Sequence, residues 1–224
     1  MSNIKSIFKP NLTSDLLVEA LHIYFSKFSI PSKYIEMGCG SGYITFKLNE
    51  HLKYSEVTLS DISDLAIEHV KEELKFNSLS YKAVVSNLFQ NIQDSDFDLI
   101  VSDVAAISED LTSITNWYDG VSCDTGRDGL KLISDLLIKS KGYLSNKGSI
   151  VYPVLSLSNT SELRSLSDRL FSKTEVLVSK DWPYKFSNDK DINLLENLKD
   201  NGLISFKYVS GFHVFNTEVW LSSI

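Results

Sequence analysis

Apolar residues recur along this chain with two spacings, one typical of helices and the other of buried strands. A helix is predicted over residues 13–28, where Thr13 or Ser14 can cap the first turn. Its apolar positions fall on one face at helical spacing: Leu17, Leu21, Tyr24, Phe25 and Phe28. The helix is therefore expected to pack on one side of the fold.

Short apolar runs follow this helix, each with the length and composition of a buried strand. They lie at 33–37, 57–60, 81–85, 98–106 and 149–154. Amphipathic helical patterns alternate with them, at 43–51, 64–76, 128–144 and 155–171. Such alternation predicts a mostly parallel sheet with helices on both faces.

The pattern changes after a sixth predicted strand at 174–178. Residues 181–202 form an aromatic-rich insertion that includes a short predicted helix. Two strands at 204–209 and 212–221, joined by Ser210-Gly211, then read as a hairpin. This hairpin is expected to supply an antiparallel strand at the edge of the sheet.

Length and composition are those of one globular domain over residues 1–224, with an N-terminal helical arm at 1–32. Hydrophobic residues make up 43% of the chain and aromatic residues 11%, enough for a sizeable core. Twenty-two Lys and Arg against 29 Asp and Glu give a formal charge of −7, without a basic run. Because nucleic-acid binders usually present a basic face, nucleic acid is disfavoured as a partner.

Cysteine and histidine residues show no metal-ligand spacing, so no metal site is predicted. There are two cysteines, Cys39 and Cys123, and four scattered histidines. The sequence also has no signal-peptide pattern and no apolar run of transmembrane length. A cytoplasmic protein without membrane contact is therefore expected.

A glycine turn follows the first predicted strand and leads into a helical pattern. Its backbone, at Gly38, Cys39, Gly40 and Gly42, is predicted to contact a nucleotide-like ligand, because a Cβ there would clash or forbid the turn. Glu36 lies two residues before the first glycine and would repel a pyrophosphate. It favours a cationic ligand such as S-adenosylmethionine, which carries an amino group and a sulfonium. The alternative is an ordinary glycine-rich turn in another α/β protein.

Polar residues end the second and third predicted strands. Asp61 lies about 20 residues beyond the glycine turn, where an acid accepts hydrogen bonds from both ribose hydroxyls. Ile62 would then cover one face of the adenine. Alternatively, Asp61 or Ser63 caps the next helix. Asn87, followed by Leu88, is predicted to accept a hydrogen bond from the adenine amino group.

The glycine turn with its preceding acid resembles the first motif of class I S-adenosylmethionine-dependent methyltransferases. Residues 8–17 (Phe-Lys-Pro-Asn-Leu-Thr-Ser-Asp-Leu-Leu) and 125–130 (Thr-Gly-Arg-Asp-Gly-Leu) are similar to segments of the HemK-like glutamine methyltransferases. The resemblance covers roughly residues 8–154. It implies a Rossmann-like α/β fold with a seven-stranded, mostly parallel sheet, helices on both faces and a reversed C-terminal hairpin strand. It also implies S-adenosylmethionine as cofactor, with Thr13 near the methionine end.

The fourth predicted strand runs out at Asp103, beside the first strand in such a sheet. HemK-like enzymes carry Asn or Asp followed by Pro-Pro-Tyr here, and these residues clamp a planar NH2 group. Asp103 keeps the polar position, but Val104, Ala105 and Ala106 replace the rest of the motif. Asp103 is the predicted catalytic residue, placed to orient or deprotonate the acceptor. The alternative is a strand-ending Asp that caps the next turn.

Aromatic residues are the predicted walls of an acceptor pocket: Trp117, Tyr118, Trp182 and Tyr184. The aromatics of the insertion can equally plug the edge of the sheet, and His213 can be a base or structural. The leading hypothesis is a methyltransferase acting on N or O of a small organic metabolite, with a homodimer left open. The alternatives are a HemK-like protein side-chain methyltransferase and a non-catalytic S-adenosylmethionine-binding partner protein.

Overall fold

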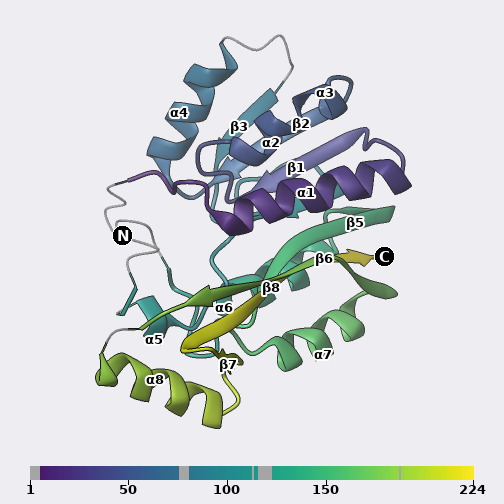
Figure 1. The fold of residues 1–224 in the computed structure, drawn as a ribbon. Helices are drawn as coiled ribbons and strands as arrows, with labels where there is room; N and C mark the ends of the chain where they lie inside the picture. Colours follow the sequence, from purple (N-terminus) through teal and green to yellow (C-terminus); the bar gives the residue numbers. More distant parts are fainter. Residues whose placement is uncertain (1–5, 76–80, 113, 116–122, 187) are drawn as a thin grey trace.

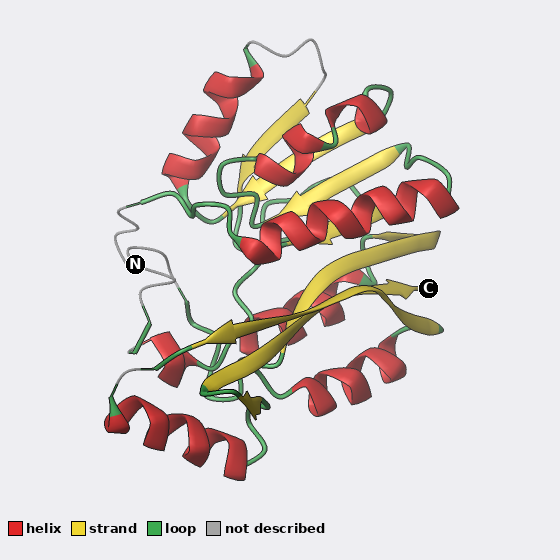
Figure 2. Ribbon diagram, viewed as in Figure 1, coloured by secondary structure: helices red, strands yellow, loops and turns green. Residues whose placement is uncertain are grey.

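A mixed eight-stranded sheet forms the centre of the computed structural model, which describes residues 6–75, 81–112, 114–115, 123–186 and 188–224 (Figures 1 and 2). The strands are β1 (Lys33–Met37), β2 (Glu56–Asp61), β3 (Tyr81–Val85), β4 (Phe97–Ser102), β5 (Leu144–Leu155), β6 (Lys173–Tyr184), β7 (Lys207–Val209) and β8 (Phe212–Ser223). The helices are α1 (Leu12–Lys27), α2 (Tyr43–Lys47), α3 (Asn49–Leu52), α4 (Asp64–Leu74), α5 (Glu109–Thr112), α6 (Lys131–Ser140), α7 (Thr160–Leu170) and α8 (Asp189–Asp200). The sheet order is β3-β2-β1-β4-β5-β8-β6, and β7 pairs with β8.

Strand β1 lies in the middle of five parallel strands. Tyr34 is paired with Val57 of β2 on one side and with Leu99 of β4 on the other. The direction in which the chain adds strands reverses between β1 and β4, which opens a crevice outside their carboxyl ends. The predicted α/β class with a mostly parallel sheet is confirmed.

Alternate residues of the central strands point into two cores. Tyr34 and Leu59 belong to a cluster that includes α1, α2 and α4. Ile35 and Ile100 point the other way, into a cluster with α6 and α7. Because both faces of these strands are covered, their sequences read as continuous apolar runs rather than as an alternation.

The predicted antiparallel C-terminal hairpin is confirmed, but it does not form the edge of the sheet. β8 lies inside the sheet, antiparallel to both β5 and β6, and β7 is only three residues long. The outer strand is β6, which continues to Tyr184, so the predicted insertion at 181–202 begins as edge strand. The 12 residues of β8 carry hydrogen-bonding groups on both edges, and an interior position satisfies both rows.

Two helix predictions change in detail. The cap of α1 is Asn11 rather than Thr13 or Ser14, and its side chain accepts hydrogen bonds from both of their backbone N–H groups in a capping box. The helix predicted over 43–51 is split into α2 and α3, which meet at Leu48.

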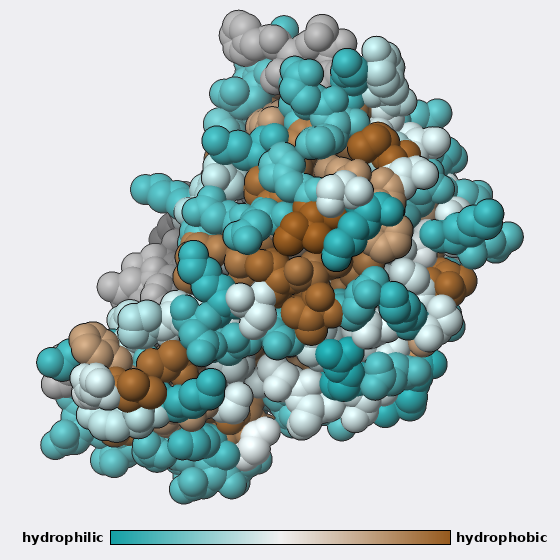
Figure 3. Space-filling view, turned by 45° about the vertical axis from the view of Figure 1, so that its right-hand side comes forward, coloured by the Kyte–Doolittle hydropathy of each residue, from teal (hydrophilic) through white to brown (hydrophobic). Residues whose placement is uncertain are grey.

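Apolar side chains gather near the centre of the face shown in Figure 3, surrounded by hydrophilic ones. Large apolar side chains that remain exposed include Phe28 and Ile30, which follow α1, and Val176 of β6. Some apolar exposure is ordinary for folded proteins. Within the described part of the chain, no helix is both long and apolar enough to cross a membrane.

Candidate active site

A cavity of about 700 Å³ lies at the carboxyl ends of the central strands, where the sheet topology places the ligand crevice. Its volume is within the range of small-molecule and cofactor sites. Seven of the predicted site residues line it: Gly38, Gly40, Asp61, Ile62, Asn87, Leu88 and Asp103. Among the described residues, Thr13, Glu36, Cys39, Gly42, Trp182 and Tyr184 are outside this lining.

The glycine turn needs glycine for two reasons. Gly38, Gly40 and Gly42 have φ angles of +72°, +51° and +76°, in the left-handed region that disfavours side chains. A Cβ at Gly42 would lie 2.6 Å from the ring of Phe46, and one at Gly38 would lie 3.0 Å from Val104. The turn therefore packs closely against both the following helix and the end of β4.

Backbone hydrogen bonds tie this turn to β2. The N–H groups of Gly38 and Cys39 both donate to the carbonyl of Ser60, at 2.8 and 3.0 Å. The Cys39 thiol is buried in the core beside α1, and burial raises its pKa well above the usual range. Cys39 is thus placed as a structural residue, and a contact with the cofactor through its backbone stays a prediction.

Glu36 is buried beneath the glycine turn. Its carboxyl accepts hydrogen bonds from the backbone N–H of Thr45, at 3.1 Å, and from the Thr45 hydroxyl. Burial raises the pKa of Glu36 to about 8, and the bonds from Thr45 oppose the shift. These contacts connect β1 to α2, and the predicted bond to a cofactor amino group stays a prediction. Thr45 was not singled out by the sequence.

Asp61 lies on the cavity wall with one bond at each carboxylate oxygen. Oδ2 accepts from the N–H of Gly40 at 2.9 Å, and Oδ1 accepts from the N–H of Ser63 at 2.8 Å. Ser63 caps α4, since its hydroxyl accepts from the N–H of Ala66. Asp61 therefore fastens the glycine turn to β2, and each oxygen keeps a lone pair for a ligand hydroxyl.

The residues after β3 form another part of the wall. Asn87 and Leu88 line the cavity, and Leu88 has a left-handed φ of +49°. Their contact with an adenine stays a prediction. Phe89 and Tyr143 also line it, and their rings stack with centroids 4.3 Å apart. The sequence pattern did not single out these two aromatics, because Tyr143 comes from a segment 54 residues away.

Asp103 follows the last residue of β4, and its side chain lines the cavity. Its backbone N–H donates to the carbonyl of Met37 at 3.3 Å, which holds it beside the end of β1. Oδ2 accepts a hydrogen bond from the hydroxyl of Ser14 at 2.7 Å. Burial raises the pKa of Asp103, and this hydrogen bond opposes the rise.

The N-terminal arm contributes residues other than the predicted Thr13. Phe8 lines the cavity, and its carbonyl would lie 3.6 Å from a Cβ placed on Gly40. The next contribution is the hydroxyl of Ser14, which reaches Asp103. Both belong to the segment 8–17 that is similar to HemK-like enzymes, but that similarity did not single out these two side chains. The docking of α1 on the sheet brings them to the site.

The predicted aromatic walls are distributed differently. Trp117 and Tyr118 lie outside the described residues. Trp182 donates a hydrogen bond from Nε1 to the Thr217 hydroxyl at 3.0 Å, and Tyr184 packs in the same apolar cluster over β8. This packing agrees with the interpretation that they close the edge of the sheet, and their contact with a substrate stays a prediction.

His213, the other open candidate, lies within the same cluster. Its ring meets those of Phe186, Phe206 and Tyr208 edge-on, and burial lowers its pKa. No hydrogen-bond partner for Nδ1 is found among the described residues. His213 therefore has the surroundings of a structural residue.

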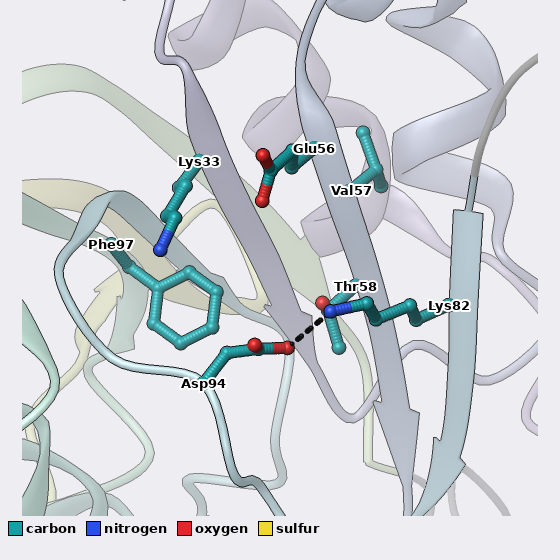
Figure 4. A pocket seen from close by; sticks show the side chains of 7 residues that line it. All are labelled: Lys33, Glu56, Val57, Thr58, Lys82, Asp94 and Phe97. Atoms are coloured by element: carbon teal, nitrogen blue, oxygen red, sulfur yellow. Dashed lines mark hydrogen bonds and ion pairs between the residues drawn. The ribbon is translucent and has the colours of Figure 1, made fainter.

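Figure 4 shows a second cavity, of about 350 Å³, at the opposite, amino-terminal side of the strands. Its walls include Lys33 and Glu56 at the starts of β1 and β2. Lys82 forms an ion pair with Asp94 across it at 2.7 Å. The cavity lacks the glycine turn and the strand-end acids, so the larger cavity is the candidate active site.

The polar groups of the larger cavity fit an adenosyl cofactor. Ser60 lines it with a buried hydroxyl that has no partner among the residues that the structure describes. Buried polar groups are normally hydrogen-bonded, so this oxygen indicates a missing partner. Together with Asp61 and the bare backbone at Gly38 and Gly40, it offers hydrogen bonds to a ribose and an amino-acid group.

Known proteins resemble this chain in both sequence and fold. Residues 4–104 match the methyltransferase small domain family. The ribosomal protein uL3 glutamine methyltransferase of Francisella tularensis is 29% identical over 126 residues, 54% of this chain and 40% of that protein. The ribosomal RNA small subunit methyltransferase C of Actinobacillus pleuropneumoniae is 30% identical over 121 residues, 54% of this chain and 32% of that protein. The chain thus spans less than half the length of these relatives.

Solved structures share the fold over nearly the whole chain. The 16S rRNA N2 G1207 methyltransferase of T. thermophilus superimposes with a TM-score of 0.57 at 15% identity, over 94% of this chain and 43% of that one. The ribosomal protein L11 methylase of Lactobacillus delbrueckii superimposes with a TM-score of 0.55 at 13% identity, over 93% and 79%. At these identities the likeness shows the fold.

Fold, site and relatives define the class. The chain resembles class I S-adenosylmethionine-dependent methyltransferases, with HemK-like members among its relatives, as the motifs predicted. The predicted small-molecule substrate, with nucleic acid disfavoured, is wrong: the relatives are named for a ribosomal protein and for ribosomal RNA. Formal charge misled because it sums the whole chain, whereas an acceptor is selected by a local surface.

Proposed function

We propose that this protein is an S-adenosylmethionine-dependent methyltransferase whose acceptor is a nitrogen on a component of the ribosome. The observation that carries the proposal is a single cavity that joins Gly38 and Gly40, Asp61 and Asp103. The first three suit a cofactor that carries ribose and an amino acid. Asp103 stands at the end of β4, where an acceptor would meet the methyl donor.

Each part of the cofactor has candidate partners on the cavity wall. The backbone at Gly38 and Gly40 would approach the methionine end, and Asp61 would accept from the ribose hydroxyls. Asn87 and Leu88 would hold the adenine, with the stacked ring of Phe89 beside them. When bound, the cofactor supplies an electrophilic methyl group, so the protein is left to align the acceptor and exclude water.

Asp103 would act on the acceptor. A carboxylate at this position accepts a hydrogen bond from an acceptor N–H and so directs the nitrogen lone pair toward the methyl group. Burial raises the pKa of Asp103, which makes its carboxylate a better proton acceptor than an exposed one. Phe8 and Val104 line the cavity as well and would supply apolar surface that excludes water from the acceptor.

A side chain of a ribosomal protein is the leading acceptor. The similar F. tularensis enzyme is named for such a substrate. A base of ribosomal RNA is the second candidate, because the similar ribosomal RNA small subunit methyltransferase C of A. pleuropneumoniae is named for such a substrate. In both cases Val104 and Ala105 replace the Pro-Pro clamp, so the acceptor would be held by contacts other than those of HemK-like enzymes.

Ribosomes from cells that lack this protein provide the test. They are incubated with tritiated S-adenosylmethionine and the purified protein, and the label is then followed separately into ribosomal proteins and RNA. Label in one protein supports the leading acceptor, and label in RNA supports the second. Label in neither fraction, or calorimetry that detects no cofactor binding at millimolar concentration, overturns the proposal.

A further inference from the structure

The hydrogen bond between Ser14 and Asp103 joins two residues that are 89 positions apart. Ser14 belongs to the first turn of α1 and is only 2% exposed. Its hydroxyl reaches out of the helix to Oδ2 of Asp103 at 2.7 Å. The bond to Asp103 is not required to cap α1, because the side chain of Asn11 already accepts hydrogen bonds from the first turn of the helix.

The capping box determines where the Ser14 proton points. The backbone N–H of Asn11 approaches the Ser14 oxygen at 3.4 Å and occupies one of its acceptor positions. The single hydroxyl proton is then donated to Asp103. Because the backbone of Asp103 is also held by the carbonyl of Met37, both ends of this residue are restrained.

We infer that Ser14 is a positioning residue, which holds Oδ2 of Asp103 so that Oδ1 is presented to the N–H of the methyl acceptor. The inference rests on the proposed function, in which Asp103 touches the acceptor. Ser14 itself touches no reacting atom. Its effect is to select one orientation of the carboxylate and to favour the unprotonated form, because a hydroxyl donor stabilises a charged acceptor.

The neighbouring acids do not prevent the Ser14 hydroxyl from stabilising the unprotonated form of Asp103. Burial raises the pKa of Asp103, and the Ser14 hydrogen bond lowers it. The titratable group that faces Asp103 from β1 is Glu36, whose own pKa is raised to about 8, chiefly by burial. Glu36 is therefore mostly neutral at pH 7 and repels Asp103 little. Asp61, from β2, also raises the pKa of Glu36.

Carbon-13 NMR of protein labelled at the Asp carboxyl groups tests the inference without any acceptor. The Asp103 signal is identified by its loss in Asp103→Asn, and its pKa is measured in wild type, Ser14→Ala and Ser14→Thr. Ser14→Ala is expected to raise the Asp103 pKa by about 1 unit, because a hydrogen bond to the charged form is lost. Ser14→Thr keeps the hydroxyl and should restore the wild-type value.

Two control variants separate this bond from helix stability. Asn11→Ala removes the cap of α1 but leaves the Ser14 hydroxyl, so it should lower the melting temperature without the pKa shift. Ser26→Ala makes the same substitution near the other end of α1, where the hydroxyl bonds to the carbonyl of Ile23. Ser26→Ala should change neither the melting temperature nor the pKa of Asp103.

Turnover on ribosomes from cells that lack this protein extends the test. Ser14→Ala should lower kcat about tenfold at pH values below the Asp103 pKa of both proteins and less above it, with the acid limb moved upward and cofactor affinity within twofold of wild type. An unchanged Asp103 pKa in Ser14→Ala overturns the inference. If wild type methylates nothing, the proposed function fails, while the NMR titration still decides whether Ser14 controls Asp103.

Discussion

The two ends of the cavity are built in different ways. At the proposed cofactor end, Gly38 and Gly40 belong to one turn, and Asp61 is bonded to that turn from only 21 residues away. At the proposed acceptor end, Asp103 is hydrogen-bonded to Ser14. Ser14 lies in the first turn of the 16-residue helix α1, at the end of that helix away from β1. One end is a local motif, and the other is assembled by tertiary contacts.

The difference explains why the ends carry different information. The three left-handed residues of the turn favour glycine at each position, so the turn can be recognised from its glycines in the sequence. A hydroxyl that reaches a carboxylate 89 residues away leaves no local spacing to read. Variants at the two ends should accordingly separate cofactor binding from turnover.

Asp103→Asn should give the largest effect, at the acceptor end. The amide keeps the shape of the side chain but cannot take a proton, so turnover is expected to fall at least about 100-fold. The dissociation constant for S-adenosylmethionine should stay within about threefold, since Asp103 is not part of the cofactor wall. Asp181→Asn on the exposed part of β6 is the matched control and should retain full activity. Full turnover by Asp103→Asn would remove it from the catalytic site.

Asp61→Ala should give the reverse pattern, at the cofactor end. Loss of the ribose contacts and of the bond to Gly40 is expected to weaken cofactor binding about 30-fold, equivalent to about 2 kcal/mol. Turnover at saturating cofactor should change much less. Isothermal titration calorimetry measures the affinity, with Ser63→Ala as a control that disturbs the α4 cap instead. Equal affinities for Asp61→Ala and wild type would contradict the assignment.

Gly42→Ala compared with Gly211→Ala separates crowding from backbone strain in the glycine turn. Both residues have a left-handed φ, +76° and +85°, but a Cβ meets Phe46 at 2.6 Å in the first and nothing within 4 Å in the second. Gly42→Ala is expected to lower the free energy of unfolding by about 2 kcal/mol and Gly211→Ala by about 1 kcal/mol. Urea denaturation measures both. Equal losses would show that strain alone accounts for the glycine.

Glu36 should make the cofactor-free protein less stable as the pH rises. Its pKa is about 8 when folded, against 4.5 as the ordinary value, so between these values the folded state retains a proton that the unfolded state has lost. Stability therefore declines from about pH 5 to pH 8 by at least about 1 kcal/mol. Glu36→Gln, neutral throughout, should flatten this slope in melting curves, whereas Glu50→Gln, at an exposed position of α3, should not. An unchanged slope in Glu36→Gln would contradict a buried, protonated Glu36.

Much of the fold could be predicted from sequence because its signals are periodic. The strands with continuous apolar runs, such as Tyr34 to Met37, are buried on both faces and read clearly. The position of β8 inside the sheet was not predicted. Its apolar pattern indicates a strand but does not indicate which strands it pairs with. Similarly, Trp182 was assigned to an insertion, although it continues β6 by pairing with Phe215.

The sequence by itself determined the local elements of the site: the glycine turn and Asp61 at the proposed cofactor end, and the strand that delivers Asp103 to the proposed acceptor end. These features are short in range and need specific side chains, or none, at each position. Only the tertiary structure decided the partners of the two central acids, Thr45 for Glu36 and Ser14 for Asp103. The physical reason is that burial and long-range hydrogen bonds set how a carboxyl ionises and where it points, and both arise from the docking of helices on the sheet.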